Sequence, residues 1–232
     1  MSHQAEYVIV AGVAWLRRSS EGDWAVTFDD RRVRTGRGRW ALEPGRAAGE
    51  LEGLTWELEL EELRPRFRSP HPLLRPVASS QLETWPALLV SGRIGDRTLD
   101  HVPGHRARLW GRRLAQHWRW AHASLPDGGW AHALAAKLPG LPVLAQHGSE
   151  LGGPGLPLAR HATDGTAWRV GPYAVDADPA SFVRLTYRDV DGSDVYCYHS
   201  PTARLTGPGL TTDVASYEIA SRELLPELEP AA

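Results

Sequence analysis

The sequence predicts an all-β protein in which two β-rich halves form antiparallel barrels or sandwiches with little helix. Three observations favour this fold class. Apolar and polar residues alternate with a period of two along many short segments, turn-forming residues occur between these segments, and helix-capping patterns are scarce. A parallel α/β sheet would require helical segments between its strands, so an antiparallel arrangement is expected.

Short alternating segments account for the first half of the chain. Its expected strands are residues 7–16, 24–28 and 56–61. In the last of these, apolar residues alternate with glutamates, which is typical of a strand with one buried face and one charged face. Residues 87–100 predict a hairpin, because Gly95 and Asp96 can adopt the backbone angles of a tight turn.

The second half shows the same kind of pattern. Its expected strands include residues 114–124, 167–173 and 215–222. A second hairpin is expected to join residues 181–188 to residues 194–200, because the segment 189–193 is rich in aspartate and contains a glycine that suits a positive φ angle.

The middle of the chain is expected to separate the two halves. Residues 130–138 predict a short helix that a Pro-Gly pair would end, and residues 141–158 are rich in glycine and proline, which favours a long crossing loop. We therefore expect an N-terminal half over residues 1–125, a connection over residues 126–160 and a C-terminal half over residues 161–232.

Composition restricts the classes of partner. The 26 basic and 28 acidic residues give a formal net charge of -2, so no overall field attracts nucleic acid or an anionic membrane. The single cysteine, Cys197, excludes an intramolecular disulfide and a multi-cysteine zinc site. No segment approaches membrane-spanning length and the first residues lack a secretory signal pattern, so a cytoplasmic location without stable membrane insertion is expected.

Residues 101–122 are the candidate site, because they contain four histidines, three tryptophans and five arginines. If the end of this segment is a strand, Trp118, Trp120 and His122 point to one face, because successive side chains point to opposite sides of a strand. An amide and a hydroxyl share that face. Such a face suits the wall of an apolar cavity that holds a few directed polar groups.

The motifs of this segment resemble those of a known family. They are Gly104-His105, then Leu-Trp-Gly-Arg-Arg at residues 109–113, then Trp-Arg-Trp-Ala-His at residues 118–122. This series is similar to the central signature of the tocopherol cyclase, carotenoid 1,2-hydratase and AttH-like group, and the similarity covers mainly residues 85–124. The resemblance implies a lipocalin-like (calycin) fold with two related barrel halves. It also implies hydration or cyclisation of polyenes by protonation of a double bond, with no metal or organic cofactor.

The chain departs from the pattern of this family in two places. Ala107 and Arg108 stand where carotenoid hydratases carry an acidic residue and a histidine, so the proton donor of that group is not carried over. The stretch before Trp110 is short for a complete lipocalin-like half, which indicates a trimmed first barrel or one closed by a partner chain. An edge strand left unpaired in this way would favour a homodimer.

Protonation of an alkene requires an acid in an apolar place and aromatic faces that stabilise the resulting cation. Trp118 and Trp120 would supply these faces, and His122 is the expected acid or base because imidazole titrates near neutral pH. A carboxyl buried beside the signature would have its pKa raised toward a useful value. The further catalytic candidates are His105, Asp100 and Glu83.

The substrate-binding candidates lie in the same segment or in the second hairpin. Besides the two indoles already named, they are Trp110, Gln116, Arg112, Tyr196, Tyr198 and His199. An inward-pointing Arg112 would either pair with a carboxylate that braces the two halves or bind a carboxylate or enolate of the substrate. No metal site is expected, because His101 and His105 would meet only on a helix, and a Pro-Gly pair lies between them.

Three functions remain open at this point. The first is a cofactor-independent cyclase, hydratase or isomerase that acts on a hydrophobic unsaturated molecule such as an isoprenoid or polyketide. The second is a non-catalytic, lipocalin-like carrier of a lipophilic ligand. The third is a pericyclase of the Diels-Alderase type, which would depend on the shape of its site more than on acid chemistry. An enzyme of the first kind must hold a titratable group with a shifted pKa near its ligand, whereas a carrier needs only an apolar lining.

Overall fold

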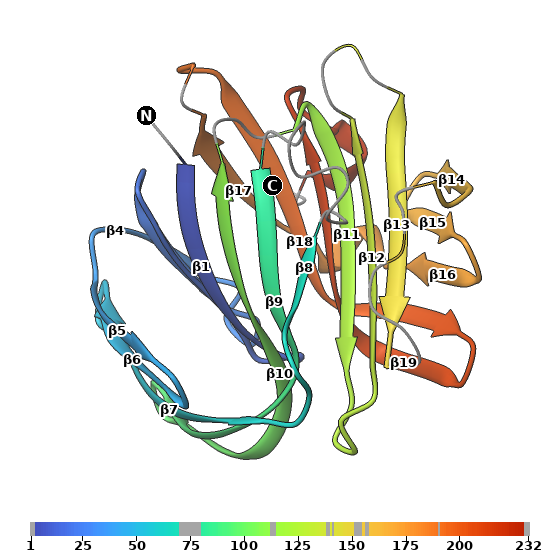
Figure 1. Cartoon of the computed structure of the whole chain (residues 1–232). Helices are drawn as coiled ribbons and strands as arrows, with labels where there is room; N and C mark the ends of the chain where they lie inside the picture. The colour runs from blue at the N-terminus through green and yellow to red at the C-terminus, as the bar shows by residue number, and fades with distance from the viewer. Residues whose placement is uncertain are drawn as a thin grey trace.

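The computed structural model of the chain describes residues 3–69, 80–111, 115–137, 140, 142–150, 155, 158–189 and 191–229. These residues form two curled antiparallel sheets that lie side by side, coloured blue to green and green to red in Figure 1. The first sheet holds ten strands and the second holds nine. The only helices among the described residues are short 3-10 turns. The prediction of an all-β antiparallel fold is confirmed.

The first sheet contains the strands β1 to β10. They are β1 (His3–Val10), β2 (Ala14–Ser19), β3 (Asp23–Thr27), β4 (Val33–Gly36), β5 (Arg39–Glu43), β6 (Arg46–Leu51), β7 (Leu54–Glu62), β8 (Phe67–Ser69), β9 (Ser80–Ile94) and β10 (Arg97–Gly111). Their order in space is β4-β3-β2-β1-β10-β9-β7-β6-β5, and β8 pairs with β9. The two ends of the sheet approach each other, because β3 and β4 also contact β6. The sheet therefore curls into a nearly closed barrel.

The second sheet contains the strands β11 to β19. They are β11 (His117–Ser124), β12 (Trp130–Lys137), β13 (Val143–Ser149), β14 (His161–Asp164), β15 (Ala167–Val170), β16 (Tyr173–Asp176), β17 (Val183–Arg188), β18 (Asp194–Gly207) and β19 (Leu210–Ser221), with the 3-10 turns η2 (Pro179–Ser181) and η3 (Pro226–Leu228). Their order in space is β13-β12-β11-β19-β18-β16-β15-β14, and β17 pairs with β18. This sheet also closes on itself, since β13 contacts β15.

Both predicted hairpins are confirmed. Strands β9 and β10 meet at a tight turn in which Gly95 has a φ angle of 55°, and β17 and β18 meet at a turn in which Gly192 has a φ angle of 81°. The expected strand over residues 7–16 is wrong, because the chain turns at residues 11–13 and forms the separate strands β1 and β2. The expected strand over residues 167–173 is likewise divided between β15 and β16.

The helix predicted over residues 130–138 is also wrong, because this segment forms β12 between β11 and β13. Its alanines favour a helix locally, but pairing on both sides overrides that preference. The alternation of Trp130 and His132 with Ala131 and Ala133 gives the strand two distinct faces. Strand β13 lies within the segment that was expected to be a loop.

The first half was expected to be trimmed or closed by a partner chain, and its sheet holds ten paired strands among the described residues. Three short strands, β4 to β6, complete it in a region where the alternation is too brief to be recognised in the sequence. Strand β10 is the last strand of the first sheet in chain order and ends at Gly111, and β11 is the first strand of the second sheet and begins at His117.

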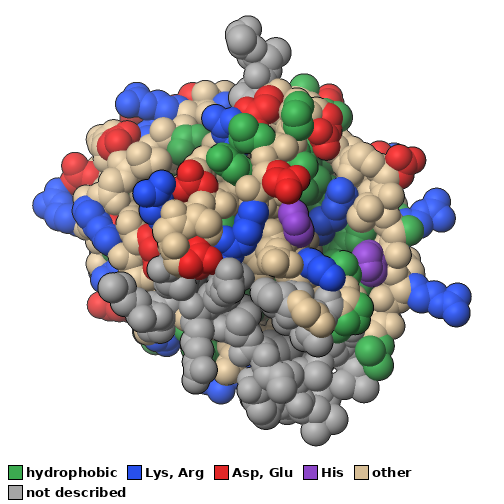
Figure 2. Space-filling view, turned by 90° about the horizontal axis from the view of Figure 1, so that it is seen from above, with side chains coloured by type: hydrophobic (Ala, Val, Ile, Leu, Met, Phe, Trp, Pro, Cys, Tyr) green, Lys and Arg blue, Asp and Glu red, His purple; other side chains and the backbone are tan. Residues whose placement is uncertain are grey.

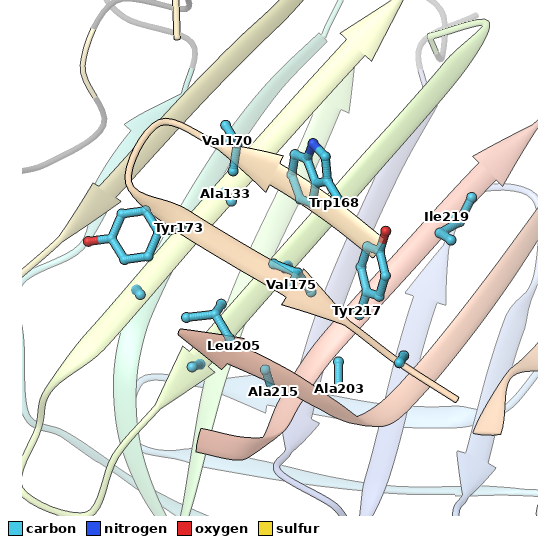
Figure 3. Close-up of a cluster of buried hydrophobic side chains, with 14 of the residues drawn as sticks. Ala133, Trp168, Val170, Tyr173, Val175, Ala203, Leu205, Ala215, Tyr217 and Ile219 are labelled. Atoms are coloured by element: carbon cyan, nitrogen blue, oxygen red, sulfur yellow. The ribbon is translucent and has the colours of Figure 1, made fainter. Parts of the chain in front are cut away.

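Each curled sheet encloses an apolar core. The core of the first barrel contains Trp56, Leu58 and Val90, and all three side chains are buried. In the second barrel, Trp168 stacks on Tyr217 with the ring centroids 6.1 Å apart, and the side chains from β12, β15, β16, β18 and β19 converge as Figure 3 shows. Because successive residues of a strand face opposite ways, the outer faces of both sheets remain available for a third cluster.

The surface is mixed in charge. On the face shown in Figure 2, acidic and basic side chains are interspersed, as the small net charge of -2 leads one to expect. Among the described residues, no helix is long and apolar enough to cross a membrane.

Candidate functional site

A third cluster of buried side chains lies between the two barrels. The first sheet contributes Trp15 and Trp24, and the second contributes Trp120, Tyr187 and Cys197. These residues lie on the outer faces of the curled strands, which meet where β9 and β10 contact β11. We call this cluster and the polar side chains packed among it the intersheet layer.

Strand β11 has the two faces that its sequence predicts. Trp120 and His122 point into the intersheet layer, while Ala121 and Ala123 point into the core of the second barrel. The indole rings of Trp15 and Trp120 lie 5.6 Å apart, so this contact joins the two sheets. His122 Nε2 donates a hydrogen bond to the carbonyl oxygen of Pro86 on β9 over 2.7 Å.

Three histidines from three strands come together beside Trp120. The ring of His122 lies 4.1 Å from that of His105 on β10 and 5.8 Å from that of His132 on β12. Burial lowers the pKa of His122 to about 4, although its hydrogen bond to Pro86 acts in the opposite direction. Burial also lowers the pKa of His105 and His132 well below the usual histidine value, and the neighbouring ring of His122 lowers both further. The three imidazoles are therefore neutral at pH 7.

His105 reaches this cluster from a β-bulge. The pairing between β9 and β10 shifts between Gly104 and Arg106, which leaves His105 paired only with Ile9 on β1. A Cβ atom at Gly104 would lie 2.6 Å from the carbonyl oxygen of Ile9 and 2.9 Å from Val90 Cγ2. Only glycine fits this close approach, so the Gly-His pair of the sequence motif has a structural reason.

Glu218 on β19 supplies the carboxyl group of the layer. It lies directly opposite Trp120 on β11 and His199 on β18, so all three side chains share the face toward the first sheet. Trp118 Nε1 donates a hydrogen bond to its Oε1 atom. Burial raises the pKa of Glu218 to about 7, although the hydrogen bond from Trp118 and the charge of Arg17 both lower it.

His199 connects Glu218 to a tyrosine. Its Nδ1 lies 3.2 Å from Glu218 Oε2, with the ring turned out of good hydrogen-bond geometry, and its Nε2 lies 3.2 Å from the hydroxyl of Tyr187. Burial lowers the pKa of His199 well below the usual value, and Arg17 lowers it further. The guanidinium of Arg17 lies over the ring of Tyr187 at 4.4 Å from its centroid. Tyr187, His199 and Glu218 thus lie in one row of buried polar groups.

Two of the predicted catalytic residues lie outside this layer. The side chain of Asp100 is 90% exposed and bonds to His101 Nδ1 over 2.6 Å. Glu83 is buried and accepts a hydrogen bond from Arg68 Nε over 2.8 Å. It lies on one face of β9, whereas its neighbour Thr84 lies on the other face, toward the layer. Neither carboxyl group is near the indoles, because strand alternation and the length of the hairpin separate them.

The predicted binding residues divide in the same way. His199 lies in the layer, whereas Tyr196 and Tyr198 point to the other side of β18, where Tyr198 donates a hydrogen bond to Glu229 over 2.8 Å. Gln116 precedes β11 and is partly buried, and Trp110 is partly buried near the end of β10. Arg112 lies outside the described residues.

Sequence reasoning missed Glu218, Trp15, Trp24 and Tyr187. The one available signal for Glu218 was a glutamate between Tyr217 and Ile219 in a predicted strand of apolar and small residues. Within the described residues, no group of three histidine, cysteine, aspartate or glutamate side chains is placed to hold a metal ion.

Comparisons with known proteins support the fold. No protein-family model and no curated protein matches the chain. Among solved structures, a crystal structure of a candidate AttH protein from Nitrosomonas europaea is similar, with a TM-score of 0.59 and 15% sequence identity. The match covers 96% of this chain and 93% of that one. The chain therefore has an AttH-like, lipocalin-type fold, as the sequence motifs led us to expect.

Proposed function

We propose that the protein is an acid-base catalyst, a cyclase, hydratase or isomerase, that acts on a hydrophobic unsaturated small molecule in the intersheet layer. The observation that supports this most strongly is Glu218, a buried carboxyl group with a pKa of about 7 beside the indoles of Trp118 and Trp120. Such a group is protonated in about half of the molecules at neutral pH, so it can both donate and accept a proton. This proposal moves the acid from His122 to Glu218.

The chemistry follows from the neighbours of the carboxyl group. Transfer of the Glu218 proton to one carbon of a double bond leaves a cation on the other carbon, and the faces of Trp118 and Trp120 stabilise positive charge. Attack by a second double bond closes a ring, addition of water gives an alcohol, and loss of a proton gives an isomer. In each case the released proton returns to the carboxylate, and the overall reaction needs no cofactor.

His199 and Tyr187 support Glu218 without touching the reacting carbon. The Tyr187 hydroxyl lies 3.2 Å from His199 Nε2 and holds the imidazole beside the carboxyl group. The neutral ring packs against Glu218 with its Nδ1 3.2 Å from Oε2, which keeps water away from the carboxyl group. Both are positioning residues in this proposal.

A carrier is the second candidate, and the carboxyl group argues against it. A lipophilic ligand requires an apolar lining, whereas a buried carboxyl group lowers the stability of the fold when its desolvation is not fully compensated. The charge of Arg17 offsets only part of this cost, because burial still raises the pKa of Glu218 to about 7. A residue that costs stability and carries a pKa near 7 is typical of a catalytic site.

The test uses deuterium from solvent as the record of proton transfer. Lipids that copurify with the protein are first identified by mass spectrometry, and these compounds, together with geranylgeraniol, squalene and lycopene, are then incubated with the protein in D2O. Catalysis through Glu218 places a carbon-bound deuteron in product or recovered substrate. We expect Glu218→Gln to abolish this incorporation and to retain binding, measured as quenching of tryptophan fluorescence.

The matched control is Glu57→Gln on β7, whose side chain is 72% exposed and points to solvent. It should incorporate deuterium at the rate of the wild type. Binding without any deuterium incorporation in the wild-type protein would favour the carrier. Turnover that persists in Glu218→Gln would contradict acid catalysis and would favour a pericyclase.

A further inference from the structure

The three-histidine cluster carries buried polar atoms that have no hydrogen-bond partner among the described residues. These atoms are His105 Nε2, His122 Nδ1 and both ring nitrogens of His132. Three more of the same kind are Thr84 Oγ1 and Gln146 Oε1 on neighbouring strands and Trp120 Nε1 within the layer. Native proteins satisfy most buried polar atoms, because an unpaired one lowers stability. Several in one place indicate a polar group that binds between them.

The hydrogen bond to Pro86 fixes the tautomer of the neutral His122 ring. The carbonyl oxygen of Pro86 only accepts hydrogen bonds, so the ring nitrogen 2.7 Å from it, Nε2, carries the proton. In the neutral ring, Nδ1 is then an acceptor with no donor. An ether, a ketone or a carboxylate cannot satisfy this atom, because none of them has a hydrogen to donate.

The ring of His132 supplies the hydrogen-bond donor that complements the acceptor atom of His122. His132 is neutral and uses neither nitrogen in a protein hydrogen bond, so it presents one donor and one acceptor. Its ring lies 5.8 Å from that of His122 and at an angle of 65° to it. A hydroxyl group between the two rings would donate to His122 Nδ1 and accept from the N–H of His132. A hydroxyl group is the smallest common function that satisfies both.

We propose that the cluster of His105, His122 and His132 binds the hydroxyl group of an unsaturated alcohol, phenol or enol. This inference rests on the proposed function, because the same molecule presents its double bond to Glu218. His122 and Glu218 lie on adjacent strands and two residues apart in register, which places their Cα atoms about 8 Å apart. One molecule can therefore present its hydroxyl group to His122 and its double bond to Glu218. The site thereby selects an oxygenated substrate over a pure hydrocarbon.

Two small probes of equal size test this inference. They are 1-octanol and heptyl methyl ether, which have the same number of heavy atoms and differ in the hydrogen that the oxygen can donate. Binding is followed through tryptophan fluorescence, because the ring centroid of Trp120 lies 5.2 Å from that of His105 and 6.0 Å from that of His122. We expect wild-type protein to bind octanol about 10-fold more tightly than the ether, the ratio that one net hydrogen bond produces.

Variants separate this subsite from the catalytic group. His122→Phe should lower octanol affinity to that of the ether, and Glu218→Gln should keep the 10-fold preference even when deuterium incorporation is lost. The matched control is His161→Phe, at an exposed histidine on β14, which should keep the preference as well. Equal affinity of wild-type protein for the two probes, absence of binding by both, or a preference that survives in folded His122→Phe would overturn the inference.

Discussion

The cores inside the two barrels and the layer between them are built from the same strands but differ in polarity. The core of the second barrel consists of side chains such as Trp168, Val175 and Leu205, whereas the intersheet layer adds Glu218 and four buried histidines to its tryptophans. Each strand assigns alternate residues to one of these two environments. One face of each sheet therefore maintains the fold, which leaves the other face free to carry groups that lower stability.

The largest effect is expected in a barrel core. Trp168 is 1% exposed and stacks on Tyr217, so Trp168→Ala removes a buried indole and leaves a cavity. We expect a loss of about 3–5 kcal/mol in the free energy of unfolding, measured by urea denaturation. Trp110→Ala, at a partly buried position, should lose much less. A loss below about 1 kcal/mol for Trp168→Ala would contradict the assignment of this core to fold stability.

The next largest change in the free energy of unfolding should come from replacing Glu218, and this change should increase stability. Its pKa is about 7 in the folded protein and 4.5 in the ordinary case, so the folded state holds the extra proton between these values. Stability is therefore highest below pH 4.5 with respect to this group and is lost as the pH rises through 7. This difference in the pKa of Glu218 corresponds to about 3 kcal/mol in the free energy of unfolding.

Glu218→Gln removes this dependence. We expect the variant to gain about 3 kcal/mol relative to wild type between about pH 5 and about pH 8, measured by urea denaturation at each pH. A stability difference that stays constant across this range would show that the carboxyl group has an ordinary pKa.

His122 should affect the free energy of unfolding at acidic pH. Its pKa is about 4 in the folded protein against the usual 6.5, so its contribution is present above pH 6.5 and is lost as the pH falls toward 4. For His122→Phe we expect the acid-induced loss to be smaller than in wild type by up to about 3 kcal/mol. The control is His161→Phe, which should lose the same free energy of unfolding at acidic pH as the wild type. An unchanged acid profile in His122→Phe would mean that the ring is not buried.

The smallest effect is expected at the surface. Arg46 and Glu57 form an ion pair of 2.6 Å between β6 and β7, with side chains that are 57% and 72% exposed. Water and salt screen such a pair, so Arg46→Ala should change the free energy of unfolding by less than about 1 kcal/mol. A larger loss would show that polar contacts outside the intersheet layer also carry the fold.

The sequence revealed the parts of the site that depend on local pattern. A period of two placed Trp118, Trp120 and His122 on one face, and that face lies between the sheets, with Trp120 and His122 buried and Trp118 partly buried. The same reasoning could not select Glu218, because it lies a hundred residues from Trp118, to which it is bonded. Which glutamate meets which indole is decided by strand pairing between distant segments, and no local pattern encodes that pairing.

The errors have the same origin. Residues of β12 favour a helix by composition, and only the strands on both sides hold them extended. Asp100 and Glu83 lie close to the signature in sequence, but a bulge and strand alternation send them away from the layer. Proximity along the chain was a poor guide to proximity in space, while alternation within one strand was a good one.

The most direct test of the account is the protonation state of Glu218. Its carboxyl group can be followed by difference infrared spectroscopy of the C=O stretch of protonated carboxyl groups, with Glu218→Gln as the reference that removes only this signal. We expect a titration midpoint close to 7 in the folded protein. A midpoint near 4.5 would contradict it, because the carboxyl group would then be solvated and could not act as an acid at neutral pH.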